Sequence, residues 1–472
     1  MQVFLYCTPF AEIFVSICTK ILYFGGGLKN FRQKSAVLKG ILVFYTNLLY
    51  NNSEKRPKIK ACKIKRWDTV KILVLNAGSS SMKFKVYAMN GLEADVLAEG
   101  NCQRVGLENS EIKYERTGAE KQKLILDLPS HQDALAQILK MLTGGSTKVL
   151  ESIQQLGAVG HRVSMGGAKY VTSVLLNEEA VREIESLRDA TPLHTPPQMN
   201  TIYACQKLLG EDFPMVVGFD TAFHQTMPPA SYLYGIPYEF YEKYGLRKFC
   251  FHGLSHQFVT ERYAEITGKN LEGTRIITCH LGGGSSVTAV QNGKSVDNSF
   301  GFGSGEGPVC GTRAGSFDHS AIPYMMQRAN LTYEEVEDIL NRKSGLLGIS
   351  GISSDEKELE ELAMQGNARA KLALDVKTQQ VKKYIGSYAF EMGGLDAIVF
   401  TGGIGENSEY CRSLICKNLE AFGVKLDEKA NVDFNRTEHK ISAPDSQVEI
   451  WIIPTNEELV IARDTKRIIE AL

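Results

Sequence analysis

The chain has 472 residues, of which 43% are apolar and 23% charged, and its formal net charge is −1. This composition is that of a globular protein long enough for two or more domains, and it excludes a disordered or fibrous chain. Residues 1–70 carry twelve Lys or Arg and three Asp or Glu, a net of +9, which leaves −10 for the remainder. An acidic body without a basic stripe argues against a nucleic-acid partner.

The cysteines and the first residues of the chain indicate in which cellular compartment the protein is expected. Ten cysteines are scattered without a Cys-x-x-Cys pair, which predicts a reduced, cytoplasmic protein. Residues 2–19 are apolar, but Pro9 and Glu12 interrupt them and the positive charges follow the run, so we expect no signal peptide and no membrane anchor. No methionine lies between the first residue and position 82, and a strand pattern starts at Val70. We therefore interpret residues 1–69 as an extension, either a misassigned start or an unstructured segment.

From Val70 onward, strand-like apolar runs alternate with helical patterns, which predicts an α/β fold. The run 71–75 leads through a Gly/Ser loop into a half-buried strand, 82–87, with Tyr87 on its polar side. The same order of strand, Gly/Ser loop and strand recurs at 275–290. Small residues let backbone N–H groups approach a phosphate closely. The repetition predicts a duplicated fold that holds one polyphosphate from both sides.

The remaining segments follow from hydrophobic periodicity and turn residues. The patterns predict, in chain order, helices over 132–142 and 148–155, strands over 157–163 and 215–220, a hairpin turn at Asn292-Gly293, helix and polar loop over 341–382, a strand over 396–401 and a final helix over 456–472.

Four loops rich in glycine or serine lie at the ends of predicted elements. They are Asn76–Lys83, His280–Ser286, Gly351–Asp355 and Gly402–Ser408. Any one of them alone would be an ordinary turn, but four in one chain indicate phosphate binding.

Two arginines stand near glycines, Arg162 in Gly160-His-Arg-Val and Arg313 in Gly311-Thr-Arg-Ala-Gly. A guanidinium there can hold a planar anion with both arms of its fork, which suits a carboxylate and a migrating phosphoryl group. A surface salt bridge is the alternative for either one. His252 and His256 have the i, i+4 spacing of metal ligands, but no Glu stands beside them as in a zinc hydrolase, which argues against a metal there.

Nine motifs follow one another from Val70 to Leu472. They are Leu75-Asn-Ala-Gly-Ser-Ser-Ser81, Gly160-His-Arg-Val163, Pro192-Leu-His194, Phe219-Asp-Thr-Ala-Phe-His-Gln-Thr-Met-Pro228, Phe251-His-Gly253, Gly311-Thr-Arg313, Ile349-Ser-Gly-Ile-Ser-Ser-Asp355, Thr401-Gly-Gly-Ile-Gly-Glu-Asn407 and Pro454-Thr-Asn-Glu-Glu-Leu459. Together they resemble the acetate kinase family, part of the superfamily of sugar kinases, heat-shock chaperone ATPases and actin. The resemblance implies a duplicated two-lobe, actin-like or ribonuclease H-like α/β ATPase fold with the active site in the cleft between the lobes. Lobe I would comprise 70–221 and 457–472, and lobe II 222–456.

The resemblance also implies roles for individual residues. The implied catalytic residues are Asp220, His252 and Arg313; the acyl-substrate residues are Arg162, Ser164, Leu193, Phe251 and Ser304; the metal ligands are Asn76 and Glu457; and the ATP-binding residues are Ser79, Ser81, Lys83, His280, Leu281, Gly282, Gly283, Gly284, Asp355, Glu356, Lys357, Gly403, Ile404, Gly405, Glu406 and Asn407. Oxygen ligands of this kind suit Mg²⁺, which keeps several waters.

The implied activity is reversible, Mg²⁺-dependent phosphoryl transfer from ATP to acetate, giving acetyl phosphate and ADP. Mn²⁺ is an alternative metal, and the resemblance implies a cytoplasmic homodimer without nucleic-acid or membrane partners. A carboxylate is already ionised at neutral pH, so no general base is needed. Asp220 is better interpreted as positioning the metal or its cationic neighbours, while His252 and Arg313 would stabilise the transferring group. A nucleotide-dependent binding module is the alternative from another class, but such a module needs no carboxylate clamp.

The chain departs from the family pattern around the acyl group. Ser164 stands where the family has Val, and Ser304 where it has Pro, so the expected pocket is larger and more polar. Propionate or a small hydroxy acid is therefore an alternative substrate. On the nucleotide side, Gly283 replaces Asn and Lys357 replaces Arg, which leaves another phosphoryl donor open.

Overall fold

The computed structural model describes residues 69–192, 194–432 and 437–472. The predicted extension, 1–69, therefore lies outside the described residues except for Thr69. The strands in the described residues are β1 (Val70–Gly78), β2 (Ser81–Asn90), β3 (Glu93–Gln103), β4 (Ser110–Arg116), β5 (Gln122–Leu126), β6 (Leu156–Val163), β7 (Val174–Leu175), β8 (Met215–Phe219), β9 (Arg275–Leu281), β10 (Ser285–Gln291), β11 (Lys294–Asn298), β12 (Ala397–Thr401), β13 (His439–Lys440) and β14 (Glu449–Ile452). The α-helices there are α3 (His131–Thr143), α4 (Glu178–Ser186), α5 (Thr195–Leu209), α6 (Pro229–Tyr232), α7 (Glu239–Tyr244), α8 (Gly253–Thr267), α9 (Ala321–Ala329), α10 (Tyr333–Asp338), α11 (Gly345–Ser350), α12 (Glu356–Met364), α13 (Ala368–Glu391), α14 (Gly402–Asn407), α15 (Glu409–Cys416), α16 (Glu428–Val432) and α17 (Glu457–Glu470).

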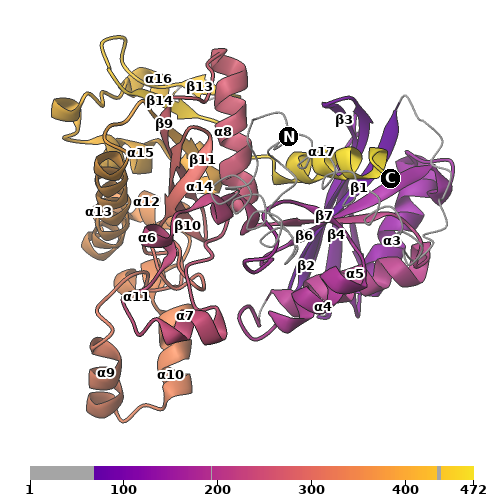
Figure 1. The fold of residues 1–472 in the computed structure, drawn as a ribbon, viewed down its shortest axis with the longest axis horizontal. Helices are drawn as coiled ribbons and strands as arrows, with labels where there is room; N and C mark the ends of the chain where they lie inside the picture. Colours follow the sequence, from indigo (N-terminus) through magenta and orange to yellow (C-terminus); the bar gives the residue numbers. More distant parts are fainter. Residues whose placement is uncertain (1–68, 193, 433–436) are drawn as a thin grey trace, which may run out of the picture. The chain divides into compact units, whose positions relative to one another are not determined.

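Two β-sheets repeat one strand order (Figure 1). The first is β5-β4-β3-β2-β1-β6-β8-β7 and the second is β11-β10-β9-β12-β14-β13. In each, three antiparallel strands, β1–β3 or β9–β11, continue from the first of them into two parallel strands, β6 and β8 or β12 and β14. The duplication expected from the two Gly/Ser loops is thus present as two copies of one five-stranded unit.

Strand β1 is buried on both faces, so its apolar residues run without interruption. Leu73 and Leu75 belong to the core that includes α3, while Ile72 and Val74 belong to the core that includes α17. This division follows from the alternation of side chains along a strand. Helices on both faces are what a continuous apolar strand requires.

Tyr87 in β2 differs from the expectation that it lies on a polar face. Its side chain is buried, and its hydroxyl lies 3.0 Å from Asn456 Oδ1, to which it donates. The reason is that α17, which is distant in sequence, covers this face of the first sheet.

Helices α8 and α17 join the two sheets through one apolar cluster. It contains Leu254 and Val259 of α8, Val74 of β1, Ile276 of β9 and Val399 of β12. Because both sheets contribute side chains to this one core, the cluster fixes the two sheets relative to each other.

The predicted lobes correspond to the two sheets in content. Strands β1–β8 fall within 70–221, strands β9–β14 within 222–456, and α17 packs against β1, β6 and β8. The boundaries themselves stay a prediction, because Arg66–Leu472 form one compact unit.

Most predicted elements lie where expected, but the helix over 148–155 is wrong. That segment has only a 3₁₀ turn at Ile153–Gln155. The backbone N–H of Val149 and of Leu150 both donate to Leu142 O at 2.9 Å, and Val149 O accepts a hydrogen bond from Lys71 Nζ at 3.4 Å. These contacts occupy the backbone groups that a helix would have used.

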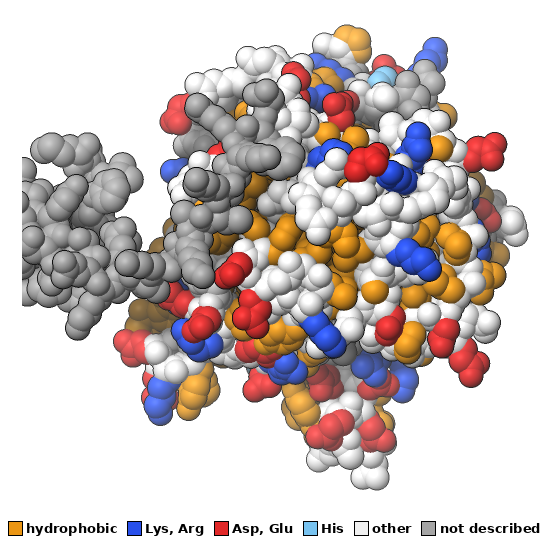
Figure 2. Space-filling view, turned by 90° about the vertical axis from the view of Figure 1, so that its right-hand side faces the viewer, with side chains coloured by type: hydrophobic (Ala, Val, Ile, Leu, Met, Phe, Trp, Pro, Cys, Tyr) orange, Lys and Arg blue, Asp and Glu red, His pale blue; other side chains and the backbone are white. Residues whose placement is uncertain are grey.

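The surface agrees with the charge pattern of the sequence. On the face shown in Figure 2, Lys and Arg side chains are interspersed with Asp and Glu, without a stripe of one sign in the described part of the chain. None of the helices in the described ranges has the length and apolar character needed to cross a bilayer.

Candidate active site

Three cavities surround the ends of the central strands, and Arg162 and His252 line two of them. The first cavity, about 820 Å³, includes Asn76, Lys83, His280, Gly403 and Glu457 in its lining. The second, about 670 Å³, includes Ser164, Asp220, Phe251, Gly284, Ser304 and Arg313. The third, about 1070 Å³, includes Gly282, Gly283, Asp355, Glu356, Lys357, Gly403, Ile404, Glu406 and Asn407. Arg162 and His252 therefore stand where a group in the first cavity would meet a group in the second.

Arg162 and Asp220 form a clamp at the carboxyl ends of two parallel strands. Arg162 lies near the end of β6, and Asp220 directly follows the neighbouring strand β8. Nε of Arg162 donates to Asp220 Oδ1 at 3.0 Å, and Nη2 donates to Oδ2 in a second, short contact. Nη1 donates to Asn76 Oδ1 at 3.1 Å, from the end of β1. Three strands thus fix one guanidinium in a single orientation.

The charges of this clamp are set by burial and by each other. Burial raises the pKa of Asp220 to about 6, while Arg162 lowers it and Glu457 raises it. Burial lowers the pKa of Arg162, but Asp220 and Glu457 together raise it by more than burial lowers it. Arg162 is therefore a cation. Above pH 6 the carboxylate is therefore ionised and both its oxygens are occupied, which suits a positioning group better than a base.

His252 has a backbone conformation that few non-glycine residues adopt. Cys250 and His252 have φ of 64° and 61°, a left-handed conformation that costs about 1 kcal/mol or more for each non-glycine residue. The next residue donates its N–H to Asp220 O at 2.8 Å, and a Cβ on this Gly253 would lie 2.1 Å from the same oxygen. Glycine is thus required here, and the contact holds His252 beside the Arg162 clamp.

A chain of hydrogen bonds runs from His252 into the protein. Its Nδ1 lies 2.8 Å from Ser286 Oγ, which is also 2.8 Å from His256 Nε2, and His256 Nδ1 is 2.7 Å from Thr278 Oγ1. The His252 ring lies 4.1 Å from that of His280. Burial first, and then these histidines, lower the pKa of His252 well below its usual value. His252 is therefore neutral, and both nitrogens of His256 are engaged by hydroxyl groups rather than available to a metal.

Arg313 approaches His252 from the second sheet's side. Its Nη1 donates to Ser304 Oγ at 2.7 Å. A Cβ on Gly284 would lie 2.7 Å from Arg313 Nη2 and 3.4 Å from His252 Cε1. The glycine at position 284 thus makes room for the two side chains to stand together, and the structure brings Arg162, His252 and Arg313 to one cavity.

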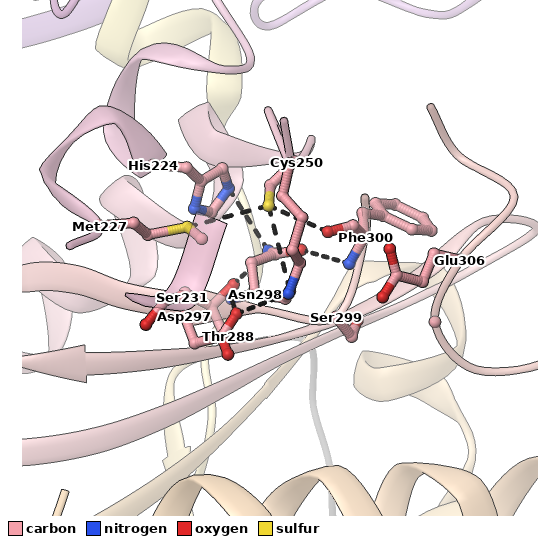
Figure 3. A network of polar contacts seen from close by, with 12 residues as sticks. His224, Met227, Ser231, Cys250, Thr288, Asp297, Asn298, Ser299, Phe300 and Glu306 are labelled. Carbon is pink, nitrogen blue, oxygen red and sulfur yellow. Dashed lines mark hydrogen bonds and ion pairs between the residues drawn. The ribbon is translucent and has the colours of Figure 1, made fainter. Parts of the chain in front are cut away.

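Two aromatic rings form the apolar wall of the second cavity. Phe251 and Phe300 meet edge to face with their centroids 6.2 Å apart. Figure 3 shows the polar contacts of Phe300: Cys250 Sγ donates to Phe300 O at 3.0 Å, and the Phe300 N–H donates to Asn298 Oδ1 at 2.7 Å. His224 Nε2 lies 3.1 Å from Phe251 O, and burial lowers its pKa to about 3. The side chains of Cys250, Asn298 and His224, which are uncharged and fully buried, therefore fix the wall.

The predicted metal ligands face the first cavity together. Asn76 Oδ1 is 3.1 Å and Glu457 Oε2 3.4 Å from Arg162 nitrogens, and Asp220 contacts the same guanidinium. The described residues contain no group of three or more His, Cys, Asp or Glu side chains arranged to hold a metal. A few hard oxygens beside an open cavity fit Mg²⁺, which keeps waters and binds phosphate oxygens, better than a metal that needs a closed cage.

Four predicted nucleotide-binding residues line none of these three cavities, namely Ser79, Ser81, Leu281 and Gly405. Ser79 is at the exposed tip of the β1–β2 hairpin, where Gly78 pairs with Ser81. Leu281 is fully buried because it alternates with His280 along β9, and Gly405 O accepts a hydrogen bond from Arg412 Nη1.

Leu193, predicted for the acyl site, lies outside the described residues. Glu356 lines the third cavity, but its carboxylate forms a buried ion pair with Lys377.

Several residues around the second cavity were missed from the sequence, among them Phe300, His194 and Gln198. His194 lines this cavity, and it belongs to a motif from which only Leu193 was assigned. Gln198, on α5, contacts the backbone and the hydroxyl of Ser164. The 34 positions between these two partners leave no local pattern that could have paired them.

Comparison with known proteins gives a consistent result. A model of the acetokinase family matches residues 71–463. The acetate kinase of Dictyoglomus turgidum is 48% identical over 400 residues, which are 85% of this chain and 98% of that protein. The crystal structure of Porphyromonas gingivalis acetate kinase superimposes with a TM-score of 0.80 at 41% identity, covering 84% of this chain and 99% of that one. A propionate kinase from Francisella tularensis gives a TM-score of 0.78 at 37% identity with the same coverage. The duplicated two-lobe α/β fold expected from the sequence is confirmed.

Proposed function

The chain belongs to the acetokinase family, and we propose that it reversibly transfers the γ-phosphoryl group of ATP to acetate, giving acetyl phosphate and ADP. A carboxylate oxygen attacks the γ-phosphorus as the bond to the ADP oxygen breaks. The observation that supports this most is that Arg162 and His252 line both the first and the second cavity. A phosphoryl donor on one side and an acid on the other would meet at these two residues.

The chemical difficulty is that both reactants are anions and repel each other. The second cavity offers cationic and neutral hydrogen-bond donors to both of them. Arg162 would fix the carboxylate, because the contacts with Asp220 and Asn76 hold its guanidinium in one orientation. Arg313 and the neutral His252 would donate to the equatorial oxygens of the transferring group. An arginine in this position contributes a factor of about 10³ or more. Asp220 acts by positioning Arg162, since its oxygens are already occupied.

Mg²⁺ is the proposed metal, with Asn76 and Glu457 as the residues that would hold it. When bound there, the ion would neutralise phosphate charge and act as a Lewis acid. Lys83, which lines the same cavity, is the proposed contact for phosphate oxygens. The nucleotide would extend into the third cavity, beside Gly282, Gly283 and the α12 and α14 termini.

Propionate is the second candidate substrate. Ser164 and Ser304 line the second cavity, at positions where the family pattern has larger apolar residues, so the space beside Phe251 accommodates a longer acyl group. The similar propionate kinase structure adds support.

The decisive experiment measures ADP release with ATP, Mg²⁺ and a panel of acids, with hydroxylamine present to trap the acyl phosphate as a hydroxamate. We expect acid-dependent turnover with one hydroxamate formed for each ADP. ATP turnover that is indifferent to every acid would contradict the kinase and favour a nucleotide-dependent binding module. A homodimer in the cytoplasm completes the proposal, and the oligomeric state is measured by light scattering of the purified protein.

A further inference from the structure

The hydroxyl of Ser164 has a proton with no partner among the described residues. The Ser164 backbone N–H can only donate, so the atom 3.1 Å from it must be Gln198 Oε1. The other end of the amide, Nε2, then lies 2.7 Å from Ser164 Oγ and must donate to it. Ser164 Oγ is therefore an acceptor in this contact, and its own proton remains to be donated.

Ser304 is in the same situation for a different reason. A guanidinium has donors only, so Ser304 Oγ accepts from Arg313 Nη1 at 2.7 Å. In the residues that the structure describes, no acceptor is recorded for the Ser304 proton. The cavity thus contains two hydroxyl donors in addition to the three donor side chains already described.

The two serine hydroxyls are donors without an assigned partner, because Arg162 is assigned to the carboxylate and His252 and Arg313 to the transferring group. Ser164 is buried, and Gln198, which orients it, is buried as well. Glu334 and Glu337 line the same cavity from α10, but no hydrogen bond joins either to Ser164 or Ser304 in the described residues. Against a purely aliphatic acyl group, the buried Ser164 proton would be left without an acceptor, which is costly. An acid with a further oxygen next to the carboxylate would satisfy it.

We propose that this pocket selects short acids with an oxygen on carbon 2, namely 2-hydroxy and 2-oxo acids of two or three carbons, through the hydroxyl donors of Ser164 and Ser304. The inference rests on the proposed kinase function and names its substrate class. The reaction is otherwise the same: a carboxylate oxygen forms the bond to the γ-phosphorus, ADP leaves, and the oxygen on carbon 2 accepts hydrogen bonds from the serines and takes no part in the bond changes.

Glycolate and propionate test this directly because they have the same number of non-hydrogen atoms and differ by an oxygen in place of a methyl group. We expect kcat/KM to be about 10-fold higher for glycolate, the size of one net hydrogen bond plus relief of an unsatisfied donor. Pyruvate against 2-methylpropanoate is a second matched pair that needs no variant. Propionate equal to or better than glycolate, with the second pair agreeing, would overturn the inference.

Two variants locate the effect. Ser164→Ala is expected to lower the glycolate-to-propionate ratio about 10-fold, and Ser304→Ala to lower it less. Thr201→Val, which removes a buried hydroxyl bonded to Pro197 O on the same helix as Gln198, should leave the ratio unchanged. A ratio that neither serine variant changes would refute the assignment. Acetate is measured alongside, since turnover of acetate without a preference for glycolate refutes this inference alone, whereas turnover of no acid refutes the kinase itself.

Discussion

Ser286 is the residue through which the protein interior sets which nitrogen of the neutral His252 ring carries the proton. A neutral histidine donates from one nitrogen and accepts at the other. The chain Thr278, His256, Ser286, His252 has two consistent directions, and only one leaves Nε2–H of His252 free to donate to a phosphoryl oxygen. In that direction Thr278 donates to His256 Nδ1, His256 Nε2 donates to Ser286, and Ser286 donates to His252 Nδ1.

Ser286→Ala removes the link and leaves a nitrogen of His252 and one of His256 without a partner. Each buried, unsatisfied group costs about 1–3 kcal/mol. If the cost at His252 appears in the transition state, kcat falls by about 5- to 150-fold. The assay is steady-state hydroxamate formation at saturating ATP and acetate, with KM for ATP followed separately and expected to change little.

Thr260→Val is the control, because Thr260 is buried like Ser286 and its Oγ1 donates to the backbone oxygen of His256 at 2.7 Å, so the variant removes a buried hydroxyl beside the same histidine without touching a ring nitrogen. It should destabilise the protein similarly while kcat stays near that of the wild type. The reasoning is refuted if Ser286→Ala keeps kcat within about twofold, or if both variants lose kcat to the same extent.

Three other predictions concern packing and charge. Gly284→Ala places a methyl group 2.7 Å from Arg313 Nη2 and should lower kcat about 100-fold by displacing the guanidinium. Gly386→Ala in α13, whose Cβ meets nothing within 4 Å, is the control, and equal losses would count against the argument. Lys377→Met leaves the buried carboxylate of Glu356 unpaired and should cost about 3–5 kcal/mol in urea unfolding, while adding Glu356→Leu should restore most of it; no recovery in the double variant would contradict this. Burial raises the pKa of Glu360 from 4.5 to about 7, so the folded state holds its proton more tightly, and the resulting stability is complete below pH 4.5 and lost as the pH rises through 7. Glu360→Gln should therefore reduce the fall in melting temperature between pH 5 and pH 8, and an unchanged fall would show that this carboxyl group is not responsible.

Local patterns in the sequence predicted the parts of the fold that local forces determine. The two hairpins with Gly/Ser loops are present, and Asn292 and Gly293 both have positive φ, as a tight hairpin turn requires. Helix α3 and helix α17 lie where their periodicity placed them. The segment 148–155 and the burial of Tyr87 could not be predicted in this way, because each depends on a distant partner, Lys71 in one case and α17 in the other.

The site divides in the same way. Arg162, Asp220, His252 and Arg313 stand in recognisable motifs, and the structure brings them to one cavity. The residues that orient these side chains do not stand in such motifs. Ser286, for example, is 34 positions from His252, and its partners are set by the pairing of β9 with β10. The motifs identify the side chains that meet in this cavity, whereas the residues that support them depend on the tertiary fold.

The central claim is that a phosphoryl donor and a carboxylate meet between Arg162, His252 and Arg313. A crystal structure with ADP, acetate, Mg²⁺ and aluminium fluoride, a mimic of the transferring phosphoryl group, tests it most directly. The account predicts the fluoride between the nucleotide and the acetate carboxylate, within hydrogen-bonding distance of His252 and Arg313. A mimic bound elsewhere, with Arg162 and Arg313 directed at different surfaces, would contradict it.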